Sequence, residues 1–281
     1  MRPTIEEKFL GLEQEHKGAV IVEIPMLMPV PKTQLEVADM LVKSGIDLIQ
    51  VSVPIRFPWM YGTRILDIQK KAAQNDVGWK QSFEVLKQLI EKYPQSEFMP
   101  VGFYGGLQRM GQDNYVRRCS DLGIRIVDVP DYPLVHDDDP RGLVKELRKN
   151  AIDYVEIIST NMTKAPKGSD GYNNLVHVIE NCHGFCFLLA SAGGKTGEKA
   201  SFDYDGLFEA KSKIQEIQKM VGRICPIVAV CGISTPEQVR ILTKQVGLHV
   251  MFGSSLFTRI MNGDSRDEIM KFLQSMKEAA C

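Results

Sequence analysis

Short apolar runs that alternate with helix-like segments constrain the fold of this chain more than any other feature of its sequence. Nearly continuous apolar runs of this length, rich in Val, Ile, Leu and Phe, are typical of strands that are buried on both faces. The eight runs are residues 19–25, 48–53, 98–103, 124–129, 154–158, 184–190, 226–230 and 249–252.

The order of these elements predicts a (β/α)8 TIM barrel. Each run leads into a helical segment or a helical loop, and strands that alternate with helices pair in parallel through right-handed crossovers. Eight such units in 281 residues fit a closed barrel better than an open doubly wound sheet, and no Gly-x-Gly-x-x-Gly follows the first run. We expect a single domain over residues 1–281, with an extra N-terminal helix at 4–16 and a short extra helix before the last helix.

Composition argues against several classes of function. The formal net charge of −1 gives no reason to expect nucleic acid or an anionic membrane as a partner. No apolar run approaches the roughly 20 residues that span a bilayer, and the charged N-terminus lacks the apolar core of a secretory signal, so we expect a cytoplasmic protein. The six cysteines show no Cys-x-x-Cys spacing. We therefore expect buried structural thiols rather than a metal or redox site.

The last two strand ends carry the clearest signal for a ligand. Gly232 and Ser234 follow the seventh run, Gly253 and Ser254 follow the eighth, and each pair leads into a helix. Backbone N–H groups and helix dipoles at these two strand ends form the usual phosphate site of a barrel. The alternative is that both glycines serve only tight strand-to-helix turns.

A glycine-rich loop one strand earlier is a candidate to close over the same phosphate. It contains Gly194, Lys195, Thr196 and Gly197. It is not a Walker A loop, because Leu189 stands where that motif requires its first glycine. Lys195 could add a positive charge beside the phosphate; the alternative is a solvated loop lysine.

Two carboxylates, Glu23 and Glu156, interrupt buried runs. A buried carboxylate is costly unless it is paired or faces a polar cavity. Either side chain could therefore point into the barrel mouth, and the alternative is a buried ion pair, for which Arg125 is a candidate. Asp131 lies at the end of the fourth run and could also cap the following turn. The acidic loop His136-Asp137-Asp138-Asp139 is expected to precede a helix at 140–150, and no metal is expected there.

Residues 49–62 form a strand that breaks at Pro54 and continues as an aromatic loop. In a barrel enzyme, the carboxyl end of a strand and the loop after it are where the chemistry takes place. Gln50 and Tyr61 are therefore candidate site residues, although neither is an obvious catalyst.

Several short motifs occur together in an order and spacing that are specific. They are residues 38–49 with Val53-Pro54, Pro58 and Gly62, Phe103-Tyr104, Gly111 and Tyr115, residues 129–133, residues 194–197, and residues 231–239 with Gly253-Ser254. Over nearly the whole chain they resemble the tryptophan synthase alpha subunit, an indole-3-glycerol-phosphate lyase.

The resemblance implies a catalytic Glu at the end of the second strand and a catalytic Asp in the loop after it. The matching positions here hold Gln50 and Tyr61. Gln cannot act as a general base, whereas Tyr can donate a hydrogen bond. The aromatic residue that packs against indole on the family's first strand is replaced by Glu23. One carboxylate has thus appeared in the implied pocket where another was lost, beside intact phosphate loops.

These changes lead us to expect a diverged lyase or aldolase that acts on a phosphorylated small molecule without a cofactor. Glu23 would be the acid/base, Gln50 would orient the substrate, and Tyr61, Tyr104 and Asp131 would assist. One alternative is a non-catalytic phosphate-ligand binder or regulatory homologue, and another is indole-3-glycerol-phosphate cleavage in a rearranged pocket. The altered loop argues against the family's partnership with a beta subunit, and a homo-oligomer is possible.

Overall fold

The computed structural model describes residues 2–26, 34–54, 63–75, 79–132, 139–190 and 203–281. Within these ranges every paired strand runs parallel to its neighbour, as the alternating sequence predicts. The strands are β1 (Val20–Pro25), β2 (Leu48–Ser52), β3 (Phe98–Val101), β4 (Ile126–Val127), β5 (Asp153–Tyr154), β6 (Glu156–Ile158), β7 (Cys186–Leu189), β8 (Ile227–Val230) and β9 (His249–Phe252).

The strands form a ring. Seven of them make one sheet in the order β3-β2-β1-β9-β8-β7-β6, and β4 pairs with β5. A bridge between Val101 and Asp128 joins β3 to β4. The expected fifth strand changes partner at Val155, because β5 bonds to β4 while β6 bonds to β7. The ring agrees with the predicted barrel, with the fifth strand divided into two short pieces.

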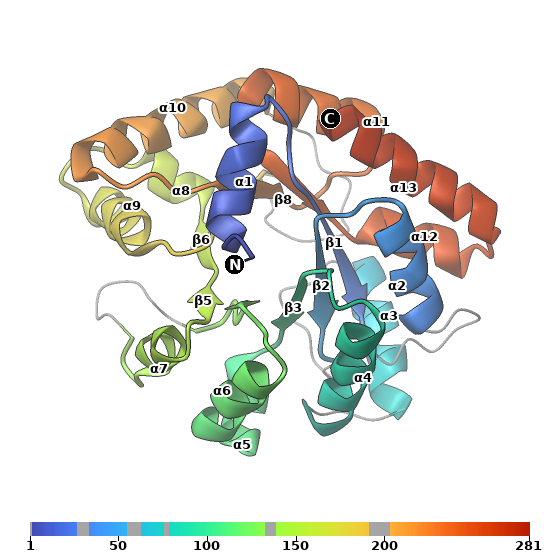
Figure 1. Cartoon of the computed structure of the whole chain (residues 1–281). Helices are drawn as coiled ribbons and strands as arrows, with labels where there is room; N and C mark the ends of the chain where they lie inside the picture. The colour runs from blue at the N-terminus through green and yellow to red at the C-terminus, as the bar shows by residue number, and fades with distance from the viewer. Residues whose placement is uncertain (1, 27–33, 55–62, 76–78, 133–138, 191–202) are drawn as a thin grey trace.

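Helices surround the ring of strands (Figure 1). They are α1 (Ile5–Gln14), α2 (Gln34–Lys43), α3 (Thr63–Asn75), α4 (Trp79–Lys92), α5 (Tyr104–Met110), α6 (Gln112–Asp121), α7 (Leu143–Lys149), α8 (Thr160–Lys164), α9 (Asp170–Asn181), α10 (Tyr204–Val221), α11 (Pro236–Arg240), the π-helix η1 (Ile241–Val246), α12 (Ser254–Met261) and α13 (Arg266–Ala280). The extra N-terminal helix is α1, and the short extra helix before the last one is α12. The helix expected at 140–150 begins only at Leu143, because Gly142 has a left-handed φ of 73°.

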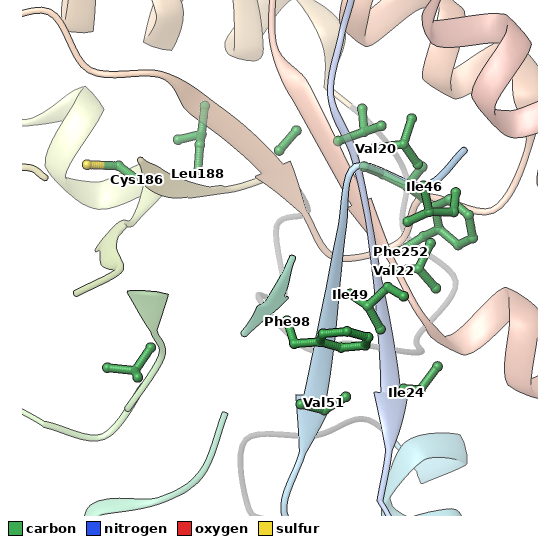
Figure 2. Close-up of a cluster of buried hydrophobic side chains, with 14 of the residues drawn as sticks. Val20, Val22, Ile24, Ile46, Ile49, Val51, Phe98, Cys186, Leu188 and Phe252 are labelled. Carbon is green, nitrogen blue, oxygen red and sulfur yellow. The ribbon is translucent and has the colours of Figure 1, made fainter. Parts of the chain in front are cut away.

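Alternation along the strands separates two apolar clusters. Val20, Val22 and Ile24 of β1 belong to the larger cluster, which lies between the strands and the outer helices (Figure 2). Ala19 and Ile21 point the other way, into a smaller cluster that fills the barrel interior. A side chain on the same face as Ile21 therefore faces the barrel interior.

The first helix packs against the amino ends of the strands. Thr4 and Glu7 form a capping box at its start, which satisfies two backbone N–H groups. Phe9 on this helix is fully buried in the interior cluster and stacks on Phe185, with the ring centroids 5.3 Å apart. The carboxyl ends of the strands, where barrel enzymes place their sites, lie at the other end.

Candidate functional site

Glu23 and Gln50 lie side by side on the interior face of the barrel. They are register partners in β1 and β2, and each side chain is only 2% exposed. Their places in the alternation match those of Ile21 and Leu48, both members of the interior cluster. Two of the residues predicted from the sequence are therefore adjacent and point inward near the carboxyl ends of their strands.

Gln50 is held by a carboxyl group that the sequence analysis did not choose as a site residue. Its Nε2 donates a hydrogen bond of 2.8 Å to Asp128 Oδ2. Asp128 Oδ1 is buried and has no hydrogen-bond partner among the described residues. Burial, together with the nearby charge of Glu23, raises the pKa of Asp128 to about 8. The acidic residue within the apolar run 124–129 was the available signal, the same one that marked Glu23.

Gly253, in one of the predicted phosphate loops, lies against Glu23. A β-carbon at residue 253 would lie 3.1 Å from Glu23 Cβ and 3.4 Å from Glu23 Oε2. A side chain at residue 253 would require Glu23 to shift by a few tenths of an ångström, so glycine suits this close approach of the loop. The structure thus brings together the first strand and the loop after the last strand, which are far apart in the sequence.

The other predicted phosphate loop has a defined turn. Cys231 and Gly232 both adopt left-handed backbone conformations, with φ of 76° and 84°. Further along the loop, Ser234 and Thr235 donate their backbone N–H groups to Gln238 Oε1 at 2.8 and 3.1 Å. The Gln238 amide therefore occupies the Ser234 donor that the sequence analysis assigned to phosphate.

Ser254 is the first residue of α12. The N-cap residue of this helix, Gly253, has no side chain that could accept a hydrogen bond from it. The first backbone N–H groups of this helix therefore receive no capping bond from Gly253. Such donors can bind an anion.

Tyr104 and Asp131 are joined to each other. Asp131 Oδ1 accepts a hydrogen bond of 2.7 Å from the Tyr104 backbone N–H at the start of α5. The Tyr104 hydroxyl donates to Gln112 Oε1 at 3.1 Å. Burial raises the pKa of Asp131, whose carboxyl is half-buried. Asp131 thus caps a helix, as the sequence analysis allowed, although that helix is α5 and not the turn that follows Asp131.

The remaining candidates divide into two groups. Glu156 shares its face of β6 with Ile158, a member of the outer cluster, so it does not point into the barrel mouth. Arg125 pairs with Glu97 at the amino ends of the strands and not with Glu23. Tyr61, Gly194, Lys195, Thr196 and Gly197 lie outside the described residues.

A comparison with protein families shows to which family the chain belongs. The family model described as the tryptophan synthase alpha chain matches residues 9–280. The chain belongs to this family. The tryptophan synthase alpha chain of Staphylococcus aureus (strain bovine RF122 / ET3-1) is 26% identical over 257 residues, covering 91% of this chain and 96% of the relative. That of Histophilus somni (strain 2336) is 25% identical and covers 98% and 97%.

Solved structures agree on the fold. Mycobacterium tuberculosis tryptophan synthase superposes with a TM-score of 0.82 at 17% identity, covering 99% of both chains. Tryptophan synthase subunit alpha from Legionella pneumophila str. Paris gives a TM-score of 0.79, also at 17% identity and 99% coverage of both chains. The family resemblance and the TIM-barrel prediction are both confirmed. Among the described residues of the present chain, no helix has the length and apolar character needed to cross a membrane.

Proposed function

We propose that this member of the tryptophan synthase alpha family is a carbon–carbon lyase or aldolase that acts on a phosphorylated small molecule. We further propose that it does not perform the family's cleavage of indole-3-glycerol phosphate. The observation that carries the proposal is the contact between the buried Glu23 and the loop glycine Gly253. A carboxylate in this place could act on carbon atoms near a phosphate that is bound at the loop.

Glu23 and Asp128 would divide the acid and base roles. The raised pKa of Asp128, about 8, keeps its carboxyl protonated at neutral pH, so it can donate a proton or a hydrogen bond. Glu23 is then the base. Gln50, fixed by its hydrogen bond to Asp128, would orient the substrate. Tyr61, Tyr104 and Asp131 would assist.

The phosphate would bind to backbone donors of the last two loops. Gly232, Gly253 and Ser254 would supply N–H groups, and Ser234 would contribute after its Gln238 partner turns aside. In the loop one strand earlier, Gly194, Lys195, Thr196 and Gly197 would close over the phosphate, with Lys195 adding a positive charge. No cofactor is required for proton-transfer chemistry of this kind.

The substitution Glu23→Gln tests the proposal. Turnover found in a screen of phosphorylated sugars and ketoses should fall by about 100-fold or more, because general acid–base catalysis typically contributes that much. The affinity for inorganic phosphate should not fall, since the donors at the loops remain and the variant removes a negative charge beside them. Glu209→Gln, an exposed residue on α10, is the matched control and should change neither quantity. Unchanged turnover in Glu23→Gln would remove the catalytic assignment.

Indole release from indole-3-glycerol phosphate tests the divergence directly. We expect none from the wild-type chain, because Gln50 and Tyr61 occupy the two positions that hold acids in the family. Indole release that depends on Glu23 or Asp128 would instead favour ordinary cleavage in a rearranged pocket. Tight phosphate-ester binding without turnover of any compound would favour the non-catalytic homologue.

The expected lack of a beta partner is tested by size-exclusion chromatography with a tryptophan synthase beta chain. We expect separate elution, because Arg56, Phe57 and Trp59 add bulk to the loop that follows the second strand. Co-elution would restore the family's usual assembly. The elution volume of the chain alone reports whether it forms a homo-oligomer.

A further inference from the structure

Three buried thiols converge at the amino ends of β7 and β8, at the end of the barrel opposite the phosphate loops. Cys182 ends α9, Cys186 is the first residue of β7, and Cys225 lies just before β8. Cys186 and Leu188 belong to the outer cluster of the barrel wall (Figure 2). Residues 182 and 225 are far apart in the sequence, and the parallel pairing of β7 with β8 brings them together.

The spacing of the three sulfur atoms suits a single metal ion. All three lie within 4.8 Å of one another, and Cys186 Sγ is 3.8 Å from Cys225 Sγ. Metal–thiolate bonds are about 2.3 Å long, which places three thiolates around one ion about 4 Å apart. The thiols therefore need only small movements to share an ion.

Polar and positively charged groups surround the sulfur atoms. Gln218 Nε2 lies 3.6 Å from Cys225 Sγ and donates a 2.7 Å hydrogen bond to the Cys225 carbonyl. Arg223 Nη2 donates to the Cys182 carbonyl at 2.6 Å. The positive charge of Lys211 also acts on Cys225.

We propose that Cys182, Cys186 and Cys225 form a three-thiolate site for the soft cation Cu(I). Thiolate ligands select soft ions. Among the described residues no His or carboxylate joins the three sulfurs, so the closed four-ligand site that structural Zn(II) requires is not formed. On binding, three S–H bonds release three protons and three S–Cu bonds form, without any change in oxidation state. Ile224, 61% exposed, precedes Cys225 and places the site just beneath the surface.

Anaerobic titration with Cu(I), in competition with a Cu(I) chelator, tests the site. We expect one tightly bound ion per chain. Replacing any one of the three cysteines by Ala should weaken binding by about 100-fold or more, since even residues behind the ligands change metal affinity by 10- to 100-fold. Cys119→Ala is the matched control, because this cysteine is also fully buried but lies on α6, outside the group. It should leave the affinity unchanged.

X-ray absorption of the copper-loaded wild-type chain provides a readout that needs no variant. Three sulfur neighbours at a single short distance are expected. Nitrogen or oxygen neighbours would overturn the proposal. Equal Cu(I) affinity in the wild-type chain and in folded Cys→Ala variants would overturn it as well, as would tighter binding of Zn(II) than of Cu(I).

Discussion

Asp128 is an ionisable group held inside an apolar barrel, and its environment stabilises the protonated form. Gln50 Nε2 is its hydrogen-bond donor, and Glu23 lies close enough to act on its charge. An amide donor such as Gln50 only partly offsets the cost of burying a negative charge. Gln at residue 50 suits this arrangement, because a further carboxylate beside Asp128 and Glu23 would add repulsion.

The first prediction concerns how Asp128 links stability to pH. Because its folded pKa of about 8 is above the unfolded value of about 4, the folded chain retains a proton between these limits that the unfolded chain has lost. This contribution is fully present below pH 4 and is lost as pH rises to 8, by up to about 1.4 kcal/mol per pH unit. Asp128→Asn should remove it.

Urea denaturation of Asp128→Asn and wild type at pH 5.5, 6.5 and 7.5 checks this linkage. We expect the variant to gain stability relative to wild type at each step upward in pH. Asp121→Asn, on the exposed end of α6, is the matched control and should show a constant difference. A constant difference for Asp128→Asn too would mean that Asp128 is ionised in the folded chain.

At the scale of elements, α1 supplies part of the barrel interior. Ile5 and Phe9 enter the same cluster as residues from β2, β3 and β4, such as Leu48, Met99 and Ile126. His249 of β9 also contacts the ring of Phe9, with ring centroids 4.9 Å apart. A helix outside the eight-unit repeat therefore contributes to the core on which the strands depend.

The second prediction is that Phe9→Ala destabilises the chain by about 3–5 kcal/mol, the usual cost of removing a buried aromatic side chain. The variant would leave a cavity beside Phe185, which the strand side chains cannot fill without leaving their own places. Chemical denaturation measures the change. Gln14→Ala, exposed on the same helix, should change stability by less than about 0.5 kcal/mol. A loss below 1 kcal/mol for Phe9→Ala would mean that α1 is not required by the core.

At the scale of the whole molecule, the ring of strands is uneven. β1 pairs with β2 over five register positions, whereas β4 and β5 pair over two. The connection from β3 to β4 is a single bridge, with hydrogen bonds from Gly102 N to Asp128 O of 3.2 Å and from Asp128 N to Pro100 O of 3.1 Å. The quarter of the ring that holds Asp128 is therefore its least extensively bonded part.

The third prediction is that this quarter opens before the rest of the barrel. Amide hydrogens of Gly102, Asp128 and Val155 should exchange at least about 10-fold faster than those of β1, because fewer neighbouring bonds must break together. Native-state hydrogen exchange resolves the two groups. Binding of a phosphorylated ligand at the carboxyl ends of the strands should slow exchange both in this quarter of the ring and in β1. Equal protection across the ring would show that it opens only as a unit.

Much of the fold followed from local sequence. β2 and β9 agree to within one residue with the apolar runs at 48–53 and 249–252, because an apolar run and its end are properties of neighbouring residues. The order of the strands followed for the same reason. In contrast, α5 was not expected, since Gly105 and Gly106 favour a turn. Its first N–H group is satisfied by Asp131, a residue on another strand end that no local pattern connects to it.

The sequence by itself determined the barrel and the family, because alternating strands and helices and the short motifs are local patterns. It left open whether Glu23 or Glu156 faces the barrel interior, and the structure turns only Glu23 inward. Only the tertiary structure decided which groups meet. Gln50 binds Asp128 across 78 positions of sequence, and Glu23 lies against Gly253 from the last strand. Cys182, Cys186 and Cys225 have no motif spacing, yet their sulfur atoms form one group. Such contacts depend on how the parallel strands are ordered around the ring. The number of residues between two positions does not specify how far apart their side chains lie in the folded chain.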